Sequence, residues 1–152
     1  MAYATSEARQ QLLDEVARAV DQIGRALAAL GEAYEQLDER AADALEEQLF
    51  RPVQAAYGRA KRTHGEFAVR YGMRRRSFAP VARGAPSRGV RGFLDDAVDA
   101  VTQADHDLAE LQDSLLPIEV GDPELRAGLA DVRVQLAQIS ARAARLMRVL
   151  GR

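Results

Sequence analysis

Apolar residues recur at alternating steps of four and three along most of the chain, and this spacing restricts the fold more than any other feature. The first series is Val16, Val20, Ile23, Leu27, Leu30, Tyr34, Leu37 and Ala41. A mean period of 3.5 residues places these side chains on one stripe of an α-helix, whereas a half-buried strand alternates at every second residue. Such stripes pack lengthwise against other helices. The sequence therefore predicts an all-α fold.

Two further series of the same spacing follow, over residues 94–115 and 125–150. Between them, Gly121, Asp122 and Pro123 have the order of a turn, an N-cap and a proline in the first helical turn, which is typical of a helix start. Pro117 is expected to end the earlier helix. At the beginning of the chain, Thr5 or Ser6 is the expected N-cap.

The regular spacing slips around Pro52. Three successive steps of four residues join Ala41, Leu45, Leu49 and Val53. Proline has no amide hydrogen to donate and disfavours helical geometry at the preceding residue, here Arg51. We therefore expect the helix to break near residues 50–52, with a possible bend at Gly31.

The predicted architecture is a single helical domain over residues 1–152. It is an elongated antiparallel helical bundle, or a coiled-coil-like set, of three to four long helices at about residues 5–50, 53–72, 92–116 and 123–150. Residues 73–91 hold Pro80 and Pro86 and are expected to form a mobile, basic loop. Because the apolar stripes are narrow, we expect leftover apolar surface to be buried in a homodimer.

Composition excludes several classes of protein. The chain has no cysteine, which removes thiol catalysis, cysteine-bound metals and a disulfide-linked secreted scaffold. No apolar run approaches the roughly 20 residues of a membrane span. We expect a cytoplasmic protein, with peripheral attachment to a membrane left open.

The two histidines point to no metal site. His106 lies between Asp105 and Asp107, but neighbouring residues on a helix point about 100° apart and cannot converge on one ion. Its single well-spaced partner is Glu110, and two ligands leave a site incomplete. His64 falls on the apolar stripe, where we expect a buried or half-buried histidine bonded to a neighbouring side chain, with a pH-sensitive packing residue as the alternative.

No catalytic or cofactor motif is present. Residues 84–89 have the two glycines of a phosphate-binding loop, but Val90 and Arg91 replace the Lys-Ser/Thr pair that the loop requires. We expect no enzyme activity, no cofactor and no metal.

Charge is distributed in blocks although the net charge is only −2. Residues 59–91 carry ten basic residues and one acidic residue, and residues 92–123 carry nine acidic residues and no basic one. The candidate residues for binding an anionic surface are Arg74, Arg75, Arg76, Arg83, Arg88 and Arg91. Four interpretations stay open: pairing with the acidic third helix or simple solvation, contact with anionic lipid, binding of nucleic acid, and binding of another protein.

A family resemblance favours the lipid interpretation. Residues 50–53 (Phe-Arg-Pro-Val) resemble the start of the second helix of BAR domains, commonly Phe-x-x-Pro-Leu, and residues 70–76 resemble its basic end. Residues 104–112 are similar to part of that family's third helix. The resemblance implies a crescent-shaped homodimer that contacts anionic membranes, with Arg74, Arg75 and Arg76 as tip residues. The function expected is thus a non-enzymatic, BAR-like binding protein; the alternatives are a scaffold bundle that binds another protein and a nucleic-acid-binding protein.

Overall fold

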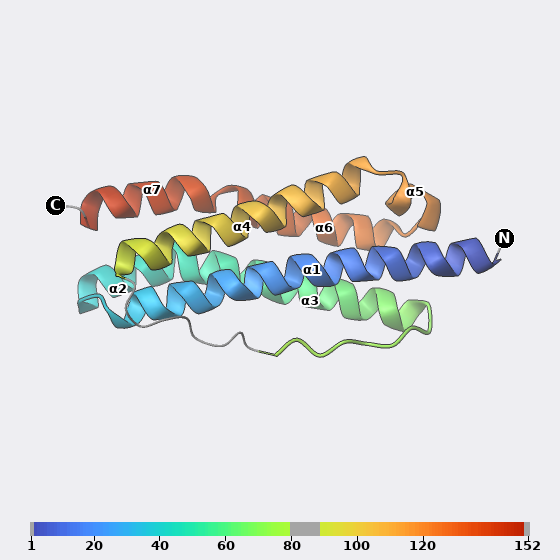
Figure 1. The fold of residues 1–152 in the computed structure, drawn as a ribbon, viewed down its shortest axis with the longest axis horizontal. Coiled ribbons are helices and arrows are strands. Elements are labelled where there is room, and N and C mark those ends of the chain that lie inside the picture. Colours follow the sequence, from blue (N-terminus) through green and yellow to red (C-terminus); the bar gives the residue numbers. More distant parts are fainter. Residues whose placement is uncertain (1, 80–88, 151–152) are drawn as a thin grey trace.

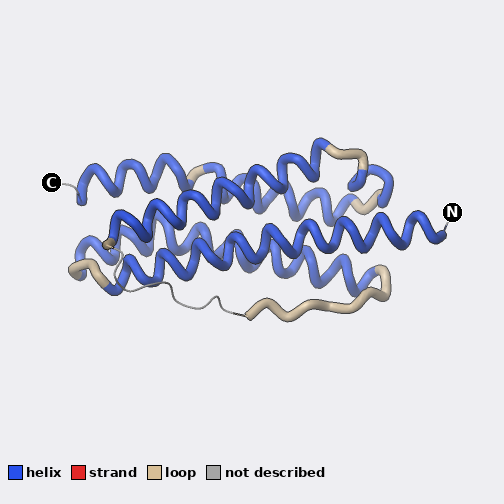
Figure 2. Tube along the Cα trace, in the orientation of Figure 1, coloured by secondary structure: helices blue, strands red, loops and turns tan. Residues whose placement is uncertain are grey.

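The computed structural model describes residues 2–79 and 89–150, and every regular element in these two ranges is helical (Figures 1 and 2). The elements are α1 (Ala2–Glu35), α2 (Glu39–Leu45), the π-helix η1 (Glu46–Phe50), α3 (Arg51–Arg70), α4 (Val90–Asp113), α5 (Leu116–Val120), α6 (Pro123–Ala137) and α7 (Ile139–Leu150). The prediction of an all-α fold made of packed helices is confirmed.

The helices form four rods around one core. α1 packs against α3 and α4, and α6 packs against the same two helices from the other side, while α7 continues beyond α6 along α4 (Figure 1). The core is built mainly from leucine, valine, isoleucine and alanine, with Phe67 and Phe93 as its buried aromatic residues. Most residues of the apolar stripes lie in this core as the sequence predicts, whereas Tyr34 and Leu115 are exposed.

The direction of the rods explains the long connection before α4. α3 and α4 run the same way, so the chain must return along the whole bundle between them (Figure 1). The connection starts at Tyr71, after α3, and ends at Gly89. We name its first part, residues 71–79, the strap; Figure 2 shows it as an extended loop that leaves the end of α3 and runs back beside the helices.

The predicted break near Pro52 is wrong. α2, η1 and α3 form one uninterrupted helical rod over residues 39–70, and the proline lies in the first turn of α3, directly after the π-helical turn. A π turn accommodates one additional residue, so Leu45, Leu49 and Val53 stay on one side of the rod, where all three are buried. The three steps of four residues are therefore the sequence signal of this turn and not of a break.

A side chain from another rod donates a hydrogen bond to a carbonyl group in the turn before the proline. In an α-helix the amide of residue 52 would donate to the carbonyl of Gln48, four residues earlier, but Pro52 has no amide hydrogen. Arg142 of α7 instead donates from Nη1 to the Gln48 oxygen at 3.4 Å. The π turn and this contact with another rod thus both lie next to the proline.

The first two rods are separated fifteen residues earlier than predicted. α1 ends at Glu35, and Asp38 begins the next helix by accepting a hydrogen bond from the Ala41 amide at 2.8 Å. α1 also begins before Thr5 and Ser6, so neither is its N-cap, and it continues through Gly31.

The second half of the chain matches the sequence more closely. Gly121 has a left-handed conformation with φ of 68°, and Asp122 accepts a hydrogen bond from the Leu125 amide at 2.8 Å, so the predicted start of α6 is confirmed. The helix predicted over residues 123–150 is divided at Gln138 into α6 and α7. α4 ends at Asp113, before Pro117, which lies in α5.

Candidate anion-binding groove

The strap is attached to the end of α3 by backbone hydrogen bonds. Gly72 has a φ of 63°, a left-handed conformation that glycine adopts without steric cost, and this turns the chain away from the helix axis. The Met73 amide then donates to the carbonyl of Ala68 at 2.7 Å. The three arginines follow at once, so their position along α1 is determined by this turn.

Arg76 fixes the far part of the strap. Its Nη2 lies 3.0 Å from the Asp21 carboxylate of α1, and its guanidinium lies 4.8 Å from the ring centroid of Phe78. The Phe78 ring stands edge-on to the imidazole of His64 on α3, with 5.1 Å between centroids. Arg76 is therefore paired within the chain, but with α1 and not with the acidic third helix.

Arg74 and Arg75 are exposed and differ from Arg76 in their partners. Within the described residues, no carboxylate lies at ion-pair distance from either guanidinium. Arg75 lies against α3 at Gly65, where a Cβ would stand 3.2 Å from its Nη2. These two arginines are consequently available to an anion from outside the chain.

The strap and two helices enclose a groove of about 600 Å³, which we name the strap groove. Its walls are Gln10, Leu13, Asp14, Ala17 and Arg18 of α1, His64 of α3, and Arg74, Arg75 and Arg76 of the strap. Four arginines thus face one carboxylate in the groove. Such an excess of positive charge attracts anions.

His64 lies at the base of the groove. It is only 2% exposed, which confirms the predicted burial, but its Nδ1 has no hydrogen-bond partner among the described residues. Burial lowers the pKa of the imidazole below its ordinary value, and the nearby charge of Arg76 lowers the pKa further, against an opposing effect of Asp14. The imidazole is therefore neutral at physiological pH.

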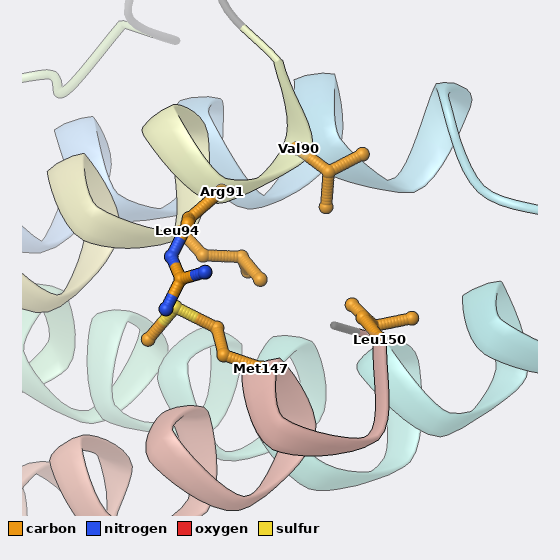
Figure 3. A pocket seen from close by; sticks show the side chains of 5 residues that line it. All are labelled: Val90, Arg91, Leu94, Met147 and Leu150. Carbon is orange, nitrogen blue, oxygen red and sulfur yellow. The ribbon is translucent and has the colours of Figure 1, made fainter. Parts of the chain in front are cut away.

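The other predicted arginines do not join this site. Arg91 is not in the loop but in the first turn of α4, at the opposite end of the bundle from the start of the strap (Figure 1). There it borders a separate, mainly apolar pocket of about 200 Å³ with Val90, Leu94, Met147 and Leu150 (Figure 3). Arg83 and Arg88 lie outside the described residues.

The second histidine is not part of a cluster. His106 pairs with Glu110 at 3.2 Å, whereas Asp105 accepts from Arg133 and Asp107 accepts from Gln103. The three neighbours thus point to three different partners, as helical geometry predicts. Over residues 2–79 and 89–150, no group of histidine and acidic side chains could hold a metal ion.

Sequence reasoning missed that α1 forms a wall of the groove and that Arg75 lies against Gly65 of α3. A glycine inside a helix can mark a close approach of another group, so Gly65 carried a usable signal. Asp14 and Arg18 carried none, because their role depends on the path of the strap.

Comparisons with protein-family models, curated proteins and solved structures find no match for this chain. None of the described helices combines the length and the apolar character needed to span a membrane. The function is therefore inferred from the geometry of the groove.

Proposed function

We propose that this chain is a non-enzymatic binding protein that contacts anionic surfaces through Arg74 and Arg75. Among such surfaces, membrane lipid is the favoured partner. The observation that carries the proposal is that both side chains are exposed on one extended segment and have no acidic partner among the described residues. Arg76 has the different task of holding that segment on α1.

Lipid is favoured over other anions by the exposure of the strap. An extended segment on the side of a rod can lie flat on a surface, where each arginine near anionic lipid contributes about 1 kcal/mol. The BAR resemblance supports the same partner. From this resemblance the proposal also includes a homodimer with elongated, coiled-coil-like helix packing. It further includes a peripheral location at a cytoplasmic membrane face.

Co-sedimentation with vesicles tests the proposal. We expect the chain to bind vesicles that contain phosphatidylserine and not neutral vesicles at low salt. Arg74→Glu with Arg75→Glu should weaken binding at least about 30-fold, because two contributions of about 1 kcal/mol are lost and repulsion is added.

The matched control is Arg145→Glu with Arg148→Glu, which makes the same charge change on two exposed residues of α7. Equal losses in both double variants would mean that net charge alone drives binding, and the strap would lose its role. Absence of vesicle binding, together with salt-sensitive binding of nucleic acid or salt-insensitive capture of a protein, would contradict the lipid proposal. A light-scattering mass of one 16.6 kDa chain would remove the dimer from it.

A further inference from the structure

We propose that the far end of the strap is an acid-sensitive latch, which protonation of His64 opens. The latch consists of Arg76 and Phe78, which hold the strap on α1 and α3 through Asp21 and His64. When the imidazole gains a proton, this end of the strap leaves the helices and Arg76 is released from its carboxylate. The latch goes beyond the proposed function and does not require it, and only its effect on membranes, given last, rests on that function.

The first argument is that the closed strap leaves no favourable place for a charged imidazole. His64 is 2% exposed, and its Nδ1 has no hydrogen-bond partner among the described residues. Whichever nitrogen carries the proton of the neutral ring, the imidazolium ion has an N–H group on both nitrogens. Protonation in the closed state therefore buries a charged N–H group without an acceptor, which costs more than burying the neutral ring.

The second argument is the charge around the ring. The charged residues that line the groove together with His64 come from two elements: Asp14 and Arg18 from α1, and Arg74, Arg75 and Arg76 from the strap. Arg76 opposes a positive charge on the imidazole and Asp14 favours it, but burial is the largest effect and acts in the same direction as Arg76. Movement of the strap relieves both unfavourable effects, because it admits water to the ring and takes Arg76 away from it.

The third argument is that few contacts hold this end of the strap. After Met73, no backbone–backbone hydrogen bond joins residues 74–79 to another described residue. The side chains of the Arg76–Asp21 ion pair are 49% and 39% exposed, and exposed pairs contribute little to stability. Phe78 is only half-buried. A segment with so few contacts opens at a lower free energy than the packed helices, so the strap is the element that responds first to the protonated imidazole.

Proton linkage limits the size of the effect. In the open state the imidazole is in water and titrates near its ordinary pKa of 6.5, whereas the closed state resists the proton. Between about pH 7.5 and about pH 5, the ratio of open to closed strap can therefore increase at most about 30-fold.

An NMR titration of the unmodified chain over this range tests the latch. The chain has two histidines, so His106→Gln assigns the His64 signals. We expect the Phe78 signals to shift with the same midpoint as the His64 imidazole, and nitrogen relaxation should show residues 76–79 becoming mobile below that midpoint. In His64→Gln, which does not titrate, the strap signals should stay unchanged. Strap signals that do not follow the imidazole, or that shift equally in His64→Gln, would overturn the inference.

Arg76→Gln provides a second test that keeps the histidine. It removes a nearby positive charge and the ion pair to Asp21, so the midpoint of the His64 titration should rise toward 6.5. Arg74→Gln is the matched control, since it makes the same charge change at an exposed strap residue that has no acidic partner within the described ranges. It should leave the midpoint nearly unchanged, and equal midpoints in the two variants would contradict the latch.

The effect on membranes rests on the proposed function. Release of Arg76 adds a third arginine, so phosphatidylserine vesicles at about pH 5 should bind the unmodified chain up to about fivefold more tightly than His64→Gln. The NMR measurements use no lipid, so the two proposals fail separately. Strap opening without vesicle binding supports the latch and contradicts the proposed function, whereas vesicle binding by a strap that does not respond to pH overturns the latch alone.

Discussion

The His64 imidazole lies beneath the strap, where it contacts Phe78 and has an Nδ1 atom without a hydrogen-bond partner in the described parts of the chain. Charged groups face it from two elements, Arg76 from the strap and Asp14 from α1. Burial and Arg76 outweigh Asp14, so the pKa of the folded-state imidazole lies below 6.5. The folded chain therefore favours the neutral form of the His64 imidazole.

This lowered pKa predicts a loss of stability in mild acid. Above pH 6.5 the imidazole is neutral in both the folded and the unfolded state, so its contribution to stability is fully present. As the pH falls from 6.5 through the folded-state pKa, the unfolded chain takes up a proton that the folded chain resists, and stability declines. Urea unfolding at about pH 7.5 and about pH 5 should show a smaller decline for His64→Gln, because glutamine does not titrate. An equal decline in both proteins would contradict the assignment to His64.

At the scale of the elements, the rod of α2, η1 and α3 shows how a proline is accommodated inside a continuous helix. The π turn keeps Leu45, Leu49 and Val53 in the core. Arg142, which lies on α7, supplies the Gln48 carbonyl with a donor. The local defect is thus corrected by a contact between two rods.

Arg142→Ala should lower the free energy of unfolding by about 1 kcal/mol, because the Gln48 carbonyl loses its donor. In a Pro52→Ala background the cost of Arg142→Ala should be clearly smaller, since the new amide at residue 52 can donate to the same carbonyl. Urea unfolding of the four proteins gives the coupling energy. Equal costs in both backgrounds would show that Arg142 acts elsewhere.

At the scale of the whole molecule, the basic residues form ion pairs with carboxylates on several different rods, and the basic block does not pair with the acidic block alone. The main link between the basic and acidic blocks joins Arg70 to Asp122, with Nε–Oδ2 and Nη2–Oδ1 distances of 3.0 and 2.8 Å. Burial alone would raise the pKa of Asp122, but hydrogen bonds from Arg70, the Leu125 amide and Tyr71 outweigh it and hold the pKa below 3.8. This carboxylate, only 3% exposed, ties the end of α3 to the start of α6.

Asp122→Asn should therefore lower the free energy of unfolding by about 2 kcal/mol at neutral pH, because the N-cap is kept but the charged hydrogen bonds from Arg70 are weakened. The lowered pKa means that the benefit of the carboxylate is fully present above pH 3.8 and is lost as the pH falls through the folded-state value. Asp131→Asn is the control, since that carboxylate pairs with Arg59 while 65% exposed and should change stability little. Similar losses in both variants, measured by urea unfolding, would contradict a special role of Asp122.

The sequence by itself determined the helical class, the stripes that form the core and the cap at Asp122. Each of these depends on residues within about four positions of one another, where helix geometry alone decides which groups meet. The same local reasoning correctly predicted the burial of His64 and the divergence of Asp105, His106 and Asp107.

Only the tertiary structure decided between a break and a π turn at Pro52, because the rod is held by packing against other helices, including the hydrogen bond from Arg142 to the Gln48 carbonyl, 94 residues apart in the sequence. It also decided which arginines are free: Asp21, the partner of Arg76, is 55 residues distant, and no local pattern relates the two. The strap runs back along the bundle because α3 and α4 point the same way. Their common direction is set by how the rods pack and not by any local sequence pattern. The strap groove and the contact of Arg75 with Gly65 exist only once this course is set.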